Sequence, residues 1–488
     1  MSIKNKKSIL LVILLLLRFT GMQYDFALNS SNIDSKVMDQ IAFTDSVLLA
    51  QYEPLDEVQI NKIYKRVYKS TILEIDNKIS AFAKKSGFNG TILLAKDGIP
   101  LYKKNIGYSD FKNKIALSDS SEFQLASVSK QFTAVAILLL EEQNKLNIDD
   151  DINYYFPKLH LSGVTIKHLL NHTSGLSDYI PIVLKKWTEK YPPTNTDVVS
   201  LLEKNRLKQR FSPGSRFQYS NTGYFLLASI VEKVSKKSMN DFLKENVFTP
   251  LGMHHTKVYN YGLNNWDSQQ IKGFKKNNYK YKAFKQGIID GVVGDKGVYA
   301  SADDLLKWSN ALYNGYIISK KTLGNAIRKS ELNNGASIKY GFGLRITENF
   351  NGKMIYHNGS WGGFRTTSRY YINESVSLII LSNNSYRYLG SLARKVKGVL
   401  DRDHANEEFL YVVKKMLLQK EMDNSMMQVS VWQKNELKDI VDLINLFDHQ
   451  WLAQKFQKSI IFGEGSDDNL YAMYGKNNYD FINFKDRL

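Results

Sequence analysis

The sequence predicts a mixed α/β (α+β) fold, in which segments from both ends of one domain form a sheet and a mainly helical insertion separates them. Strand-like segments lie near residues 90–104 and again at 353–382, whereas the stretch of about 126–330 has mostly helix and loop signals. The 43% hydrophobic and 12% aromatic content is that of a folded globular protein. A cleft between the sheet and the insertion is a natural place for a site.

The first predicted elements are a helix and a hairpin. A polar lead-in over residues 24–75 passes into a helix that continues to about Lys84. The strand-like segments 90–95 and 100–104 then flank Asp97-Gly98, a pair of residues that favours a tight hairpin turn. The insertion begins with a helix at 127–145, where apolar residues recur at the spacing of one helix face. Further helices are expected at 222–237 and 302–313.

The closing elements return to strand signals. Segments 353–357, 364–372 and 376–382 are rich in β-formers, and Asn373-Glu374 between the last two favours a turn. An amphipathic stretch at 386–400 then predicts a helix. We therefore expect the folded domain to span 76–405. Residues 406–488 form a C-terminal extension that contains no chemical motif.

The N-terminal segment, residues 1–23, has the pattern of an export signal. Lys4, Lys6 and Lys7 precede nine apolar residues that Arg18 ends. Nine residues at about 1.5 Å each cannot cross a hydrocarbon layer of roughly 30 Å. We expect an exported protein of the periplasm or cell envelope, or a secreted one. No clear small-x-small cleavage site follows, so an uncleaved N-terminal anchor stays the alternative, and it would be the only membrane contact.

The composition excludes several kinds of chemistry. There is no cysteine, which rules out disulfides, thiolate metal sites and a thiol nucleophile. We expect no metal and no cofactor. The formal net charge is +18, but the lysines are scattered among many asparagines and no nucleic-acid motif accompanies them. We interpret this charge as a compositional bias and expect no nucleic-acid partner.

The candidate nucleophile is Ser127, in Ser127-Val-Ser-Lys130 at the start of the predicted helix 127–145. Residues i and i+3 share a helix face, so the Lys130 amine can point at the Ser127 hydroxyl. A serine hydroxyl needs a base to take its proton, and a buried lysine can be that base. The helix N-terminus adds N–H groups that suit developing negative charge. Taken alone the motif is weak, because lysine is abundant here.

Two further motifs follow in order. In Tyr219-Ser-Asn221 a tyrosine can share proton transfer with a lysine, and an asparagine amide can hold a substrate carbonyl. His357-Asn-Gly359-Ser360 is expected to end a strand, where glycine lets a substrate approach the backbone and the strand edge offers peptide hydrogen bonds. His172, four residues after His168, is expected to be structural, because Leu169 stands where a zinc-protease motif needs glutamate.

The order Ser-x-x-Lys, Tyr-x-Asn, His-x-Gly resembles the serine β-lactamase and penicillin-binding protein family, of the class C β-lactamase and D-alanyl-D-alanine carboxypeptidase type. The sequence around these motifs is similar too, over roughly residues 75–400. The matching segments are Phe123-Gln-Leu-Ala-Ser-Val-Ser-Lys-Gln-Phe-Thr133, Leu169-Leu-Asn-His-Thr-Ser-Gly175, Pro250-Leu-Gly-Met253, Gly297-Val-Tyr-Ala-Ser301 and Tyr340-Gly-Phe-Gly343.

The resemblance implies an antiparallel sheet flanked by helices, a helical subdomain and a cleft between them. It also implies a two-step acyl transfer in which Ser127 is acylated while Lys130 and Tyr219 act as general base and acid. The oxyanion would bind the backbone N–H groups of Ser127 and Ser360. Three residues would contact the substrate: Asn221, Gly359 and His357, the last of which would face the substrate carboxylate or the Tyr219 hydroxyl.

His357 is a departure from typical class C β-lactamases, which carry lysine at this position. Lysine gives a fixed positive charge for a β-lactam carboxylate, whereas histidine is only partly charged near neutrality. The sequence therefore favours a carboxypeptidase-like peptidase or an esterase, which acts on small acyl, peptide or β-lactam-like substrates, cell-wall fragments among them. A true class C-like β-lactamase is one alternative. A non-catalytic envelope protein that binds muropeptides or a protein partner is the other.

Overall fold

The computed structural model describes residues 68–401, apart from 264–269, 278–279 and 350–351, together with five positions between 58 and 65. One compact unit runs from Lys69 to Arg402. The predicted leader 1–23, most of the lead-in and the extension 406–488 lie outside the described residues. Within the described part of the chain, no helix is both long and apolar enough to span a bilayer.

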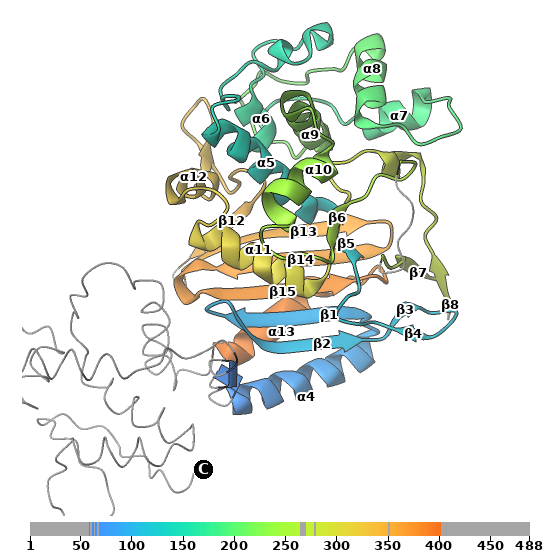
Figure 1. Ribbon diagram of the computed structural model, residues 1–488, viewed down its shortest axis with the longest axis vertical. Coiled ribbons are helices and arrows are strands. Elements are labelled where there is room, and N and C mark those ends of the chain that lie inside the picture. Colours follow the sequence, from blue (N-terminus) through green and yellow to red (C-terminus); the bar gives the residue numbers. More distant parts are fainter. Residues whose placement is uncertain are drawn as a thin grey trace, which may run out of the picture. The chain divides into compact units, whose positions relative to one another are not determined.

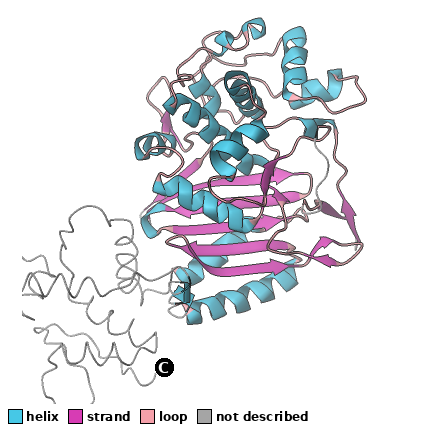
Figure 2. Ribbon diagram, in the orientation of Figure 1, coloured by secondary structure: helices cyan, strands magenta, loops and turns pink. Residues whose placement is uncertain are grey.

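A six-stranded antiparallel sheet forms the centre of this unit, with the strand order β12-β13-β14-β15-β1-β2 (Figures 1 and 2). The first hairpin joins the late strands because β1 pairs with β15 along its whole length, from Gly90 opposite Ser382 to Lys96 opposite Val376. This confirms that distant segments close one sheet. The strands are β1 (Gly90–Lys96), β2 (Ile99–Ile106), β12 (Arg345–Asn349), β13 (Gly352–Trp361), β14 (Phe364–Tyr371) and β15 (Val376–Ser382).

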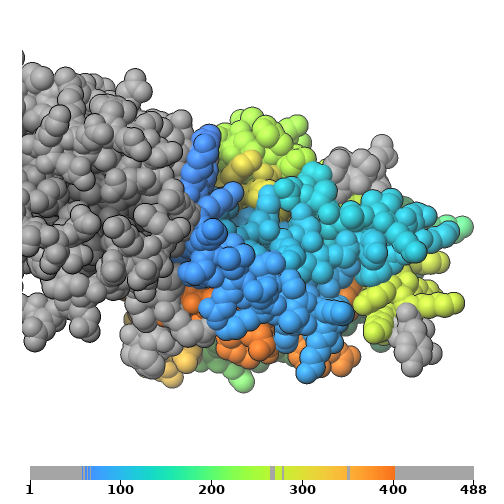
Figure 3. All heavy atoms as spheres, turned by 90° about the horizontal axis from the view of Figure 1, so that it is seen from below, coloured from blue at the N-terminus to red at the C-terminus, as the bar shows by residue number. Residues whose placement is uncertain are grey.

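Helices cover both faces of the sheet, and this explains why its strand β15 is buried along its whole length. Every residue of β15 is buried, as a strand between two helical layers requires. On one face α4 (Lys69–Ser86) and α13 (Leu389–Leu400) contact each other, and Figure 3 shows the blue and orange ends of this unit side by side. On the other face α11 (Ala302–Asn314) packs on β15 and β1.

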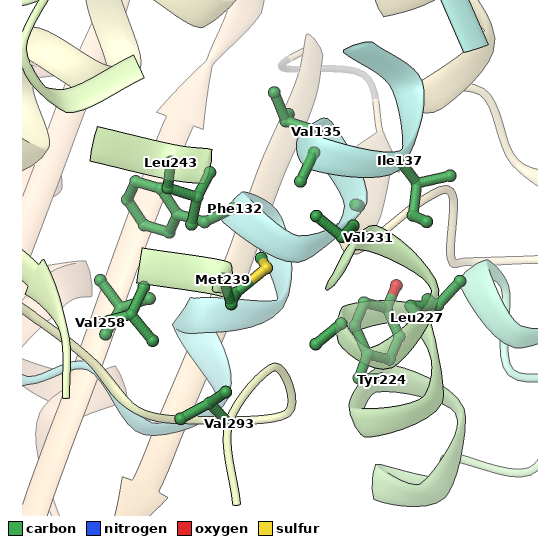
Figure 4. Packing of buried hydrophobic residues seen from close by; sticks show 14 of the residues in the cluster. Phe132, Val135, Ile137, Tyr224, Leu227, Val231, Met239, Leu243, Val258 and Val293 are labelled. Atoms are coloured by element: carbon green, nitrogen blue, oxygen red, sulfur yellow. The ribbon is translucent and has the colours of Figure 1, made fainter. Parts of the chain in front are cut away.

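The helical part is built around α5 (Lys130–Glu142), which packs against α9 (Asn221–Ser235). Figure 4 shows this packing, with Phe132 and Val135 of α5 near Val231 of α9 in one apolar cluster. The other helices are α6 (Ile166–Leu170), α7 (Ile180–Lys186), α8 (Asn195–Asn205), α10 (Met239–Leu243) and α12 (Lys320–Ala326). Shorter turns are η1 (Ala126–Ser129), η2 (Ile152–Tyr154), η3 (Pro157–Leu159), η4 (Lys244–Phe248), η5 (Ile288–Gly291) and η6 (Ile372–Glu374).

The stretch 126–330 consists mostly of helices and loops, as expected, but it also contains short strands, some of which pair with segments distant in the sequence. The motif at His357 lies at the end of a strand, as expected, but β13 is longer than the predicted segment 353–357 and continues through the motif to Trp361 in register with β14. The remaining short strands are β3 (Tyr108–Asp110), β4 (Ile115–Ala116), β5 (Phe123–Gln124), β6 (Thr256–Val258), β7 (Phe274–Asn277), β8 (Lys280–Ala283), β9 (Val298–Ala300), β10 (Ser330–Glu331) and β11 (Ser337–Ile338).

Phe132 tests how strongly the domain depends on the core beneath α5. Its ring is fully buried and stacks on Trp308 with centroids 4.0 Å apart. We expect Phe132→Ala to lower the free energy of unfolding by about 3–5 kcal/mol, because the cavity cannot close. Urea unfolding measures this, and Leu184→Ala at an exposed position of α7 is the control, expected within about 0.5 kcal/mol of wild type. A loss below about 1 kcal/mol for Phe132→Ala would contradict this prediction.

Candidate active site

Ser127 lies in the tight turn η1, between β5 and α5. The preceding residue, Ala126, has a φ of 51°, a left-handed conformation that costs a residue with a side chain about 1–3 kcal/mol. Two hydrogen bonds hold this backbone in place: Leu125 N donates to Val298 O at 2.8 Å, and Thr366 Oγ1 donates to Leu125 O at 2.7 Å. The fold therefore maintains local strain next to the predicted nucleophile.

Lys130 is fully buried and joins three parts of the site. Its Nζ lies 3.3 Å from Ser127 Oγ, 3.0 Å from Asn221 Oδ1 and 2.8 Å from the backbone oxygen of Asp295. The Asn221 amide has a fixed orientation as a result, and its Nδ2 lies 3.5 Å from Asp178 Oδ2. The contact expected from the i, i+3 spacing is present, although α5 itself begins only at Lys130 and Ser127 belongs to the turn before it.

Tyr219 stands between two cations in the loop before α9. The centre of its half-buried ring lies 5.0 Å from Lys130 Nζ and 5.3 Å from the guanidinium carbon of Arg345 on β12. The structure therefore brings Ser127, Lys130, Tyr219 and Asn221 together as predicted. Their catalytic roles stay predictions, because no substrate is present.

His172 lies behind Tyr219 and shapes its surroundings. Ser220 N donates to His172 Nδ1 at 3.1 Å, and the imidazole centroid is 4.3 Å from that of the Tyr219 ring and 4.6 Å from that of Tyr340. Burial, and then the charge of Lys130, hold the pKa of His172 well below its usual range. This arrangement is the structural role that the sequence predicted for His172.

His357 is buried and makes two hydrogen bonds inside the protein. Its Nδ1 lies 2.8 Å from Asn358 O, which can only accept, so Nδ1 carries the proton and Nε2 accepts from Tyr340 OH at 3.1 Å. Burial, followed by the charges of Lys130 and Arg345, holds the pKa of His357 well below its usual range. The ring is thus a neutral support for Tyr340, and its expected contact with the substrate or with the Tyr219 hydroxyl stays a prediction.

Arg345 is a fixed positive charge close to His357, and no motif in the sequence indicated it. The side chain is half-buried beside Tyr219 and Tyr340, with no carboxylate partner among the described residues. It follows the Tyr340–Gly343 motif by two residues, and the return of the chain from β12 to β13 places it opposite Tyr356, next to His357. That cross-strand neighbourhood is not visible in the sequence.

Gly359 allows the turn that carries Ser127 to lie against β13. A Cβ atom at position 359 would lie 2.2 Å from both Leu125 O and Thr366 Oγ1. The packing of the protein itself therefore requires glycine there. Its predicted contact with substrate stays a prediction. From His357 to Trp361, β13 pairs only with β14 among the described residues, and Ser360 in this segment is exposed. The opposite edge of this segment, which β12 does not cover, is open to an extended substrate.

A second buried lysine, Lys296, supports Lys130 from behind. Lys296 Nζ donates to Tyr179 OH at 2.9 Å and lies 3.3 Å from Asp295 Oδ1, while Tyr179 OH donates to Asp295 Oδ2 at 3.3 Å. Burial, and then the charge of Asp295, raise the pKa of Tyr179. This closed network holds Asp295, whose backbone oxygen accepts from Lys130. Tyr179 is far in the sequence from Asp295 and Lys296, and no sequence motif indicates the network.

The comparisons with known proteins agree with this geometry. Residues 75–399 match the family described as Beta-lactamase. The chain belongs to the β-lactamase family. Penicillin-binding protein 4* of Bacillus subtilis is 37% identical over 334 residues, which are 65% of this chain and 72% of that protein. A D-aminopeptidase of Gluconobacter oxydans is 24% identical over 62% of this chain and 57% of its own length.

Solved structures share the fold. A penicillin-binding protein from Bacillus halodurans superposes with a TM-score of 0.57 at 25% identity, over 66% of this chain and 98% of that one. A D-amino acid amidase from Ochrobactrum anthropi has a TM-score of 0.55 at 21% identity, over 71% and 99% of the two chains. The family and the constellation at Ser127 make this protein a serine hydrolase of the β-lactamase and penicillin-binding type.

The two buried imidazoles predict how stability depends on pH. Because the pKa of both His172 and His357 is lowered on folding, the unfolded chain binds more protons than the folded protein below about pH 6.5. Their contribution is fully present above that pH and is lost as the pH falls towards the folded values, at up to about 1.4 kcal/mol per pH unit for each histidine. Urea unfolding at pH 7.5, 6.5 and 5.5 measures the slope.

His357→Gln is the matched variant for this measurement. It keeps a hydrogen-bonding side chain but removes one titrating group, so its slope between pH 7 and 5.5 should be smaller by about one proton. A wild-type stability that is flat or rises as the pH falls through this window would show that the imidazoles are not held neutral.

Proposed function

We propose that this enzyme cleaves amide or ester bonds in small substrates with D-configured residues, through a covalent acyl-enzyme on Ser127, as a carboxypeptidase-like peptidase or an esterase. The observation that carries the proposal is the contact set of Lys130. Its Nζ donates to Asn221 Oδ1 at 3.0 Å and to Asp295 O at 2.8 Å, and these two contacts hold it 3.3 Å from Ser127 Oγ. The amine is therefore within reach of the Ser127 hydroxyl, whose proton it can take once it is itself deprotonated.

The reaction follows from this arrangement. Ser127 Oγ attacks the substrate carbonyl while its proton moves to Lys130 Nζ, and the oxyanion is stabilised by the N–H groups of Ser127 and Ser360. Tyr219, beside Lys130, passes the proton to the leaving amine or alcohol. Asn221 orients the acyl group, and water then attacks the ester on Ser127 to release the acid.

Arg345 supports a substrate that carries a carboxylate next to the scissile bond. Its half-buried guanidinium has no carboxylate partner among the described residues and lies beside Tyr219, where an arginine can bind a carboxylate through two hydrogen bonds. The relatives named penicillin-binding protein, D-aminopeptidase and D-amino acid amidase support substrates of the D-configured amide class. A class C-like β-lactamase remains the alternative, and a non-catalytic binding protein for muropeptides or a protein partner the second one.

The proposed location is outside the cytoplasm. The basic, apolar start of the chain supports export to the periplasm or cell envelope, either cleaved or retained as an anchor. Cell-wall fragments are therefore candidate substrates of the proposed activity.

Labelling tests the nucleophile. We expect a fluorophosphonate or penicillin probe to modify the wild-type chain at Ser127, and Ser127→Ala to lose labelling and at least about 10³-fold of its hydrolytic activity. The neighbouring Ser129→Ala is the control. The Ser129 hydroxyl accepts a hydrogen bond from Val298 N and is not one of the three groups that contact Lys130 Nζ. A Ser127→Ala protein with full turnover would rule out the assignment.

Kinetics with three substrates test the subclass: a D-alanyl-D-alanine peptide, a cephalosporin and a short-chain ester. We expect the peptide to be preferred and Arg345→Ala to raise its KM about tenfold or more, because a charge-assisted hydrogen bond contributes about 1.5–3 kcal/mol. The same peptide with a C-terminal amide should be insensitive to this change, and Arg369→Ala on β14 is the control variant. Faster turnover of the ester, independent of Arg345, would favour an esterase.

A further inference from the structure

The hairpin β7–β8 and its flanks carry a dense group of lysines. The stretch from Gln270 to Gly287 contains no aspartate or glutamate. We call this segment the lysine hairpin, and its six lysines are all exposed: Lys272, Lys275, Lys276, Lys280, Lys282 and Lys285. Six exposed lysines and no carboxylate are therefore gathered on one small surface.

The register of the hairpin gathers three of these lysines on one face. Lys275 lies directly opposite Lys282, and Lys280 is two residues from Lys282, so all three share a face of the ribbon. Like charges directly opposite one another destabilise a hairpin by roughly 0.2–1 kcal/mol. None of the three has an ion pair with a carboxylate in the part of the chain that the structure describes. The hairpin thus maintains an uncompensated positive face.

The other face of the hairpin is anchored to the domain. The Tyr281 ring stacks on Phe111 with centroids 3.9 Å apart, and Phe111 also packs edge-on against Phe274 at 4.8 Å. Phe274 N donates to Asn383 O at 2.6 Å, which ties β7 to the residue after β15. The lysines are therefore presented by a fixed surface.

This surface adjoins the active site. A side chain at Gly273 would come within 1.9 Å of Gly362 O, so the backbone of the hairpin touches the β13–β14 turn two residues after Ser360 (Figure 1). Arg365 lies opposite Ser360 in the sheet, and its pKa is lowered by burial and by the nearby charge of Arg387. The positive charge therefore extends from the lysine hairpin to the rim of the site.

We propose that the lysine hairpin, with Arg365 and Arg387, is a docking surface for a linear, phosphate-bearing polymer. Lysine ammonium groups bind phosphates as point charges, and a flexible chain with regularly spaced anions can neutralise Lys275, Lys280 and Lys282 together. A membrane surface fits less well, because Phe284 is the only large apolar side chain of the described hairpin that is markedly exposed. A polymer bound here would present attached acyl groups to Ser127, a consequence that rests on the proposed function.

Binding of long-chain inorganic polyphosphate to the full-length protein tests the surface. We expect the triple variant Lys275→Glu, Lys280→Glu, Lys282→Glu to lose at least about tenfold in affinity at 0.1 M salt. Its slope of log affinity against log salt should be smaller by about 2, since each lysine that neutralises a phosphate of a single chain contributes about 0.7. Lys190→Glu, Lys320→Glu, Lys321→Glu is the control, because it makes the same change of net charge at exposed sites away from the hairpin.

The outcomes separate the docking surface from the catalytic proposal. Turnover of a small ester or peptide should be unchanged in the hairpin variant, and Ser127→Ala should bind polyphosphate like wild type, so either idea can fail alone. Equal losses in the hairpin variant and the control, or no loss in either, would reject the docking surface. Tighter, hairpin-dependent binding to anionic phospholipid vesicles or to duplex DNA than to polyphosphate would also reject the proposed partner.

Discussion

The contact between the turn η1 and the strand β13 is the constraint on which the site depends. Gly359 leaves room for Leu125 and Ala126, and the unusual backbone of Ala126 then turns Ser127 towards Lys130. A side chain at Gly359 would push the turn away from the strand and separate the nucleophile from the open edge. The six-stranded sheet and its helical layers hold the turn and the strand in place, and the buried cluster around Phe132 supports this contact.

The positive charges of the site affect which neighbouring groups can be protonated, as well as which groups they attract. Lys130, Lys296 and Arg345 are all buried or half-buried within one region, and of the three only Lys296 has a carboxylate partner among the described residues. Burial, and then these positive charges, disfavour protonation of His172 and His357, so both imidazoles are neutral and serve as hydrogen-bonding supports. His357 makes its hydrogen bonds within the protein, and the guanidinium of Arg345 on the neighbouring strand supplies a positive charge in the same region.

Outside the site, the fold changes the interpretation of the basic composition. In the sequence the lysines look like a bias shared with asparagine. In the structure, an aromatic anchor through Phe111 and Tyr281 fixes one lysine-rich hairpin beside the β13–β14 turn. Its opposed Lys275 and Lys282 cost stability without a partner inside the described chain. Such a cost is expected where a surface serves an external anion.

The sequence by itself determined the sheet closed by its two ends, the helices α5, α9 and α11, and the residues Ser127, Lys130, Tyr219 and Asn221, because periodicity and short motifs are local. It did not determine Arg345, the Asp295–Lys296–Tyr179 network, the extent of β13 or the lysine hairpin's place beside the site. Tertiary structure decided these, because each depends on strand register and burial between segments far apart in the chain. Contacts of that kind leave no spacing to recognise.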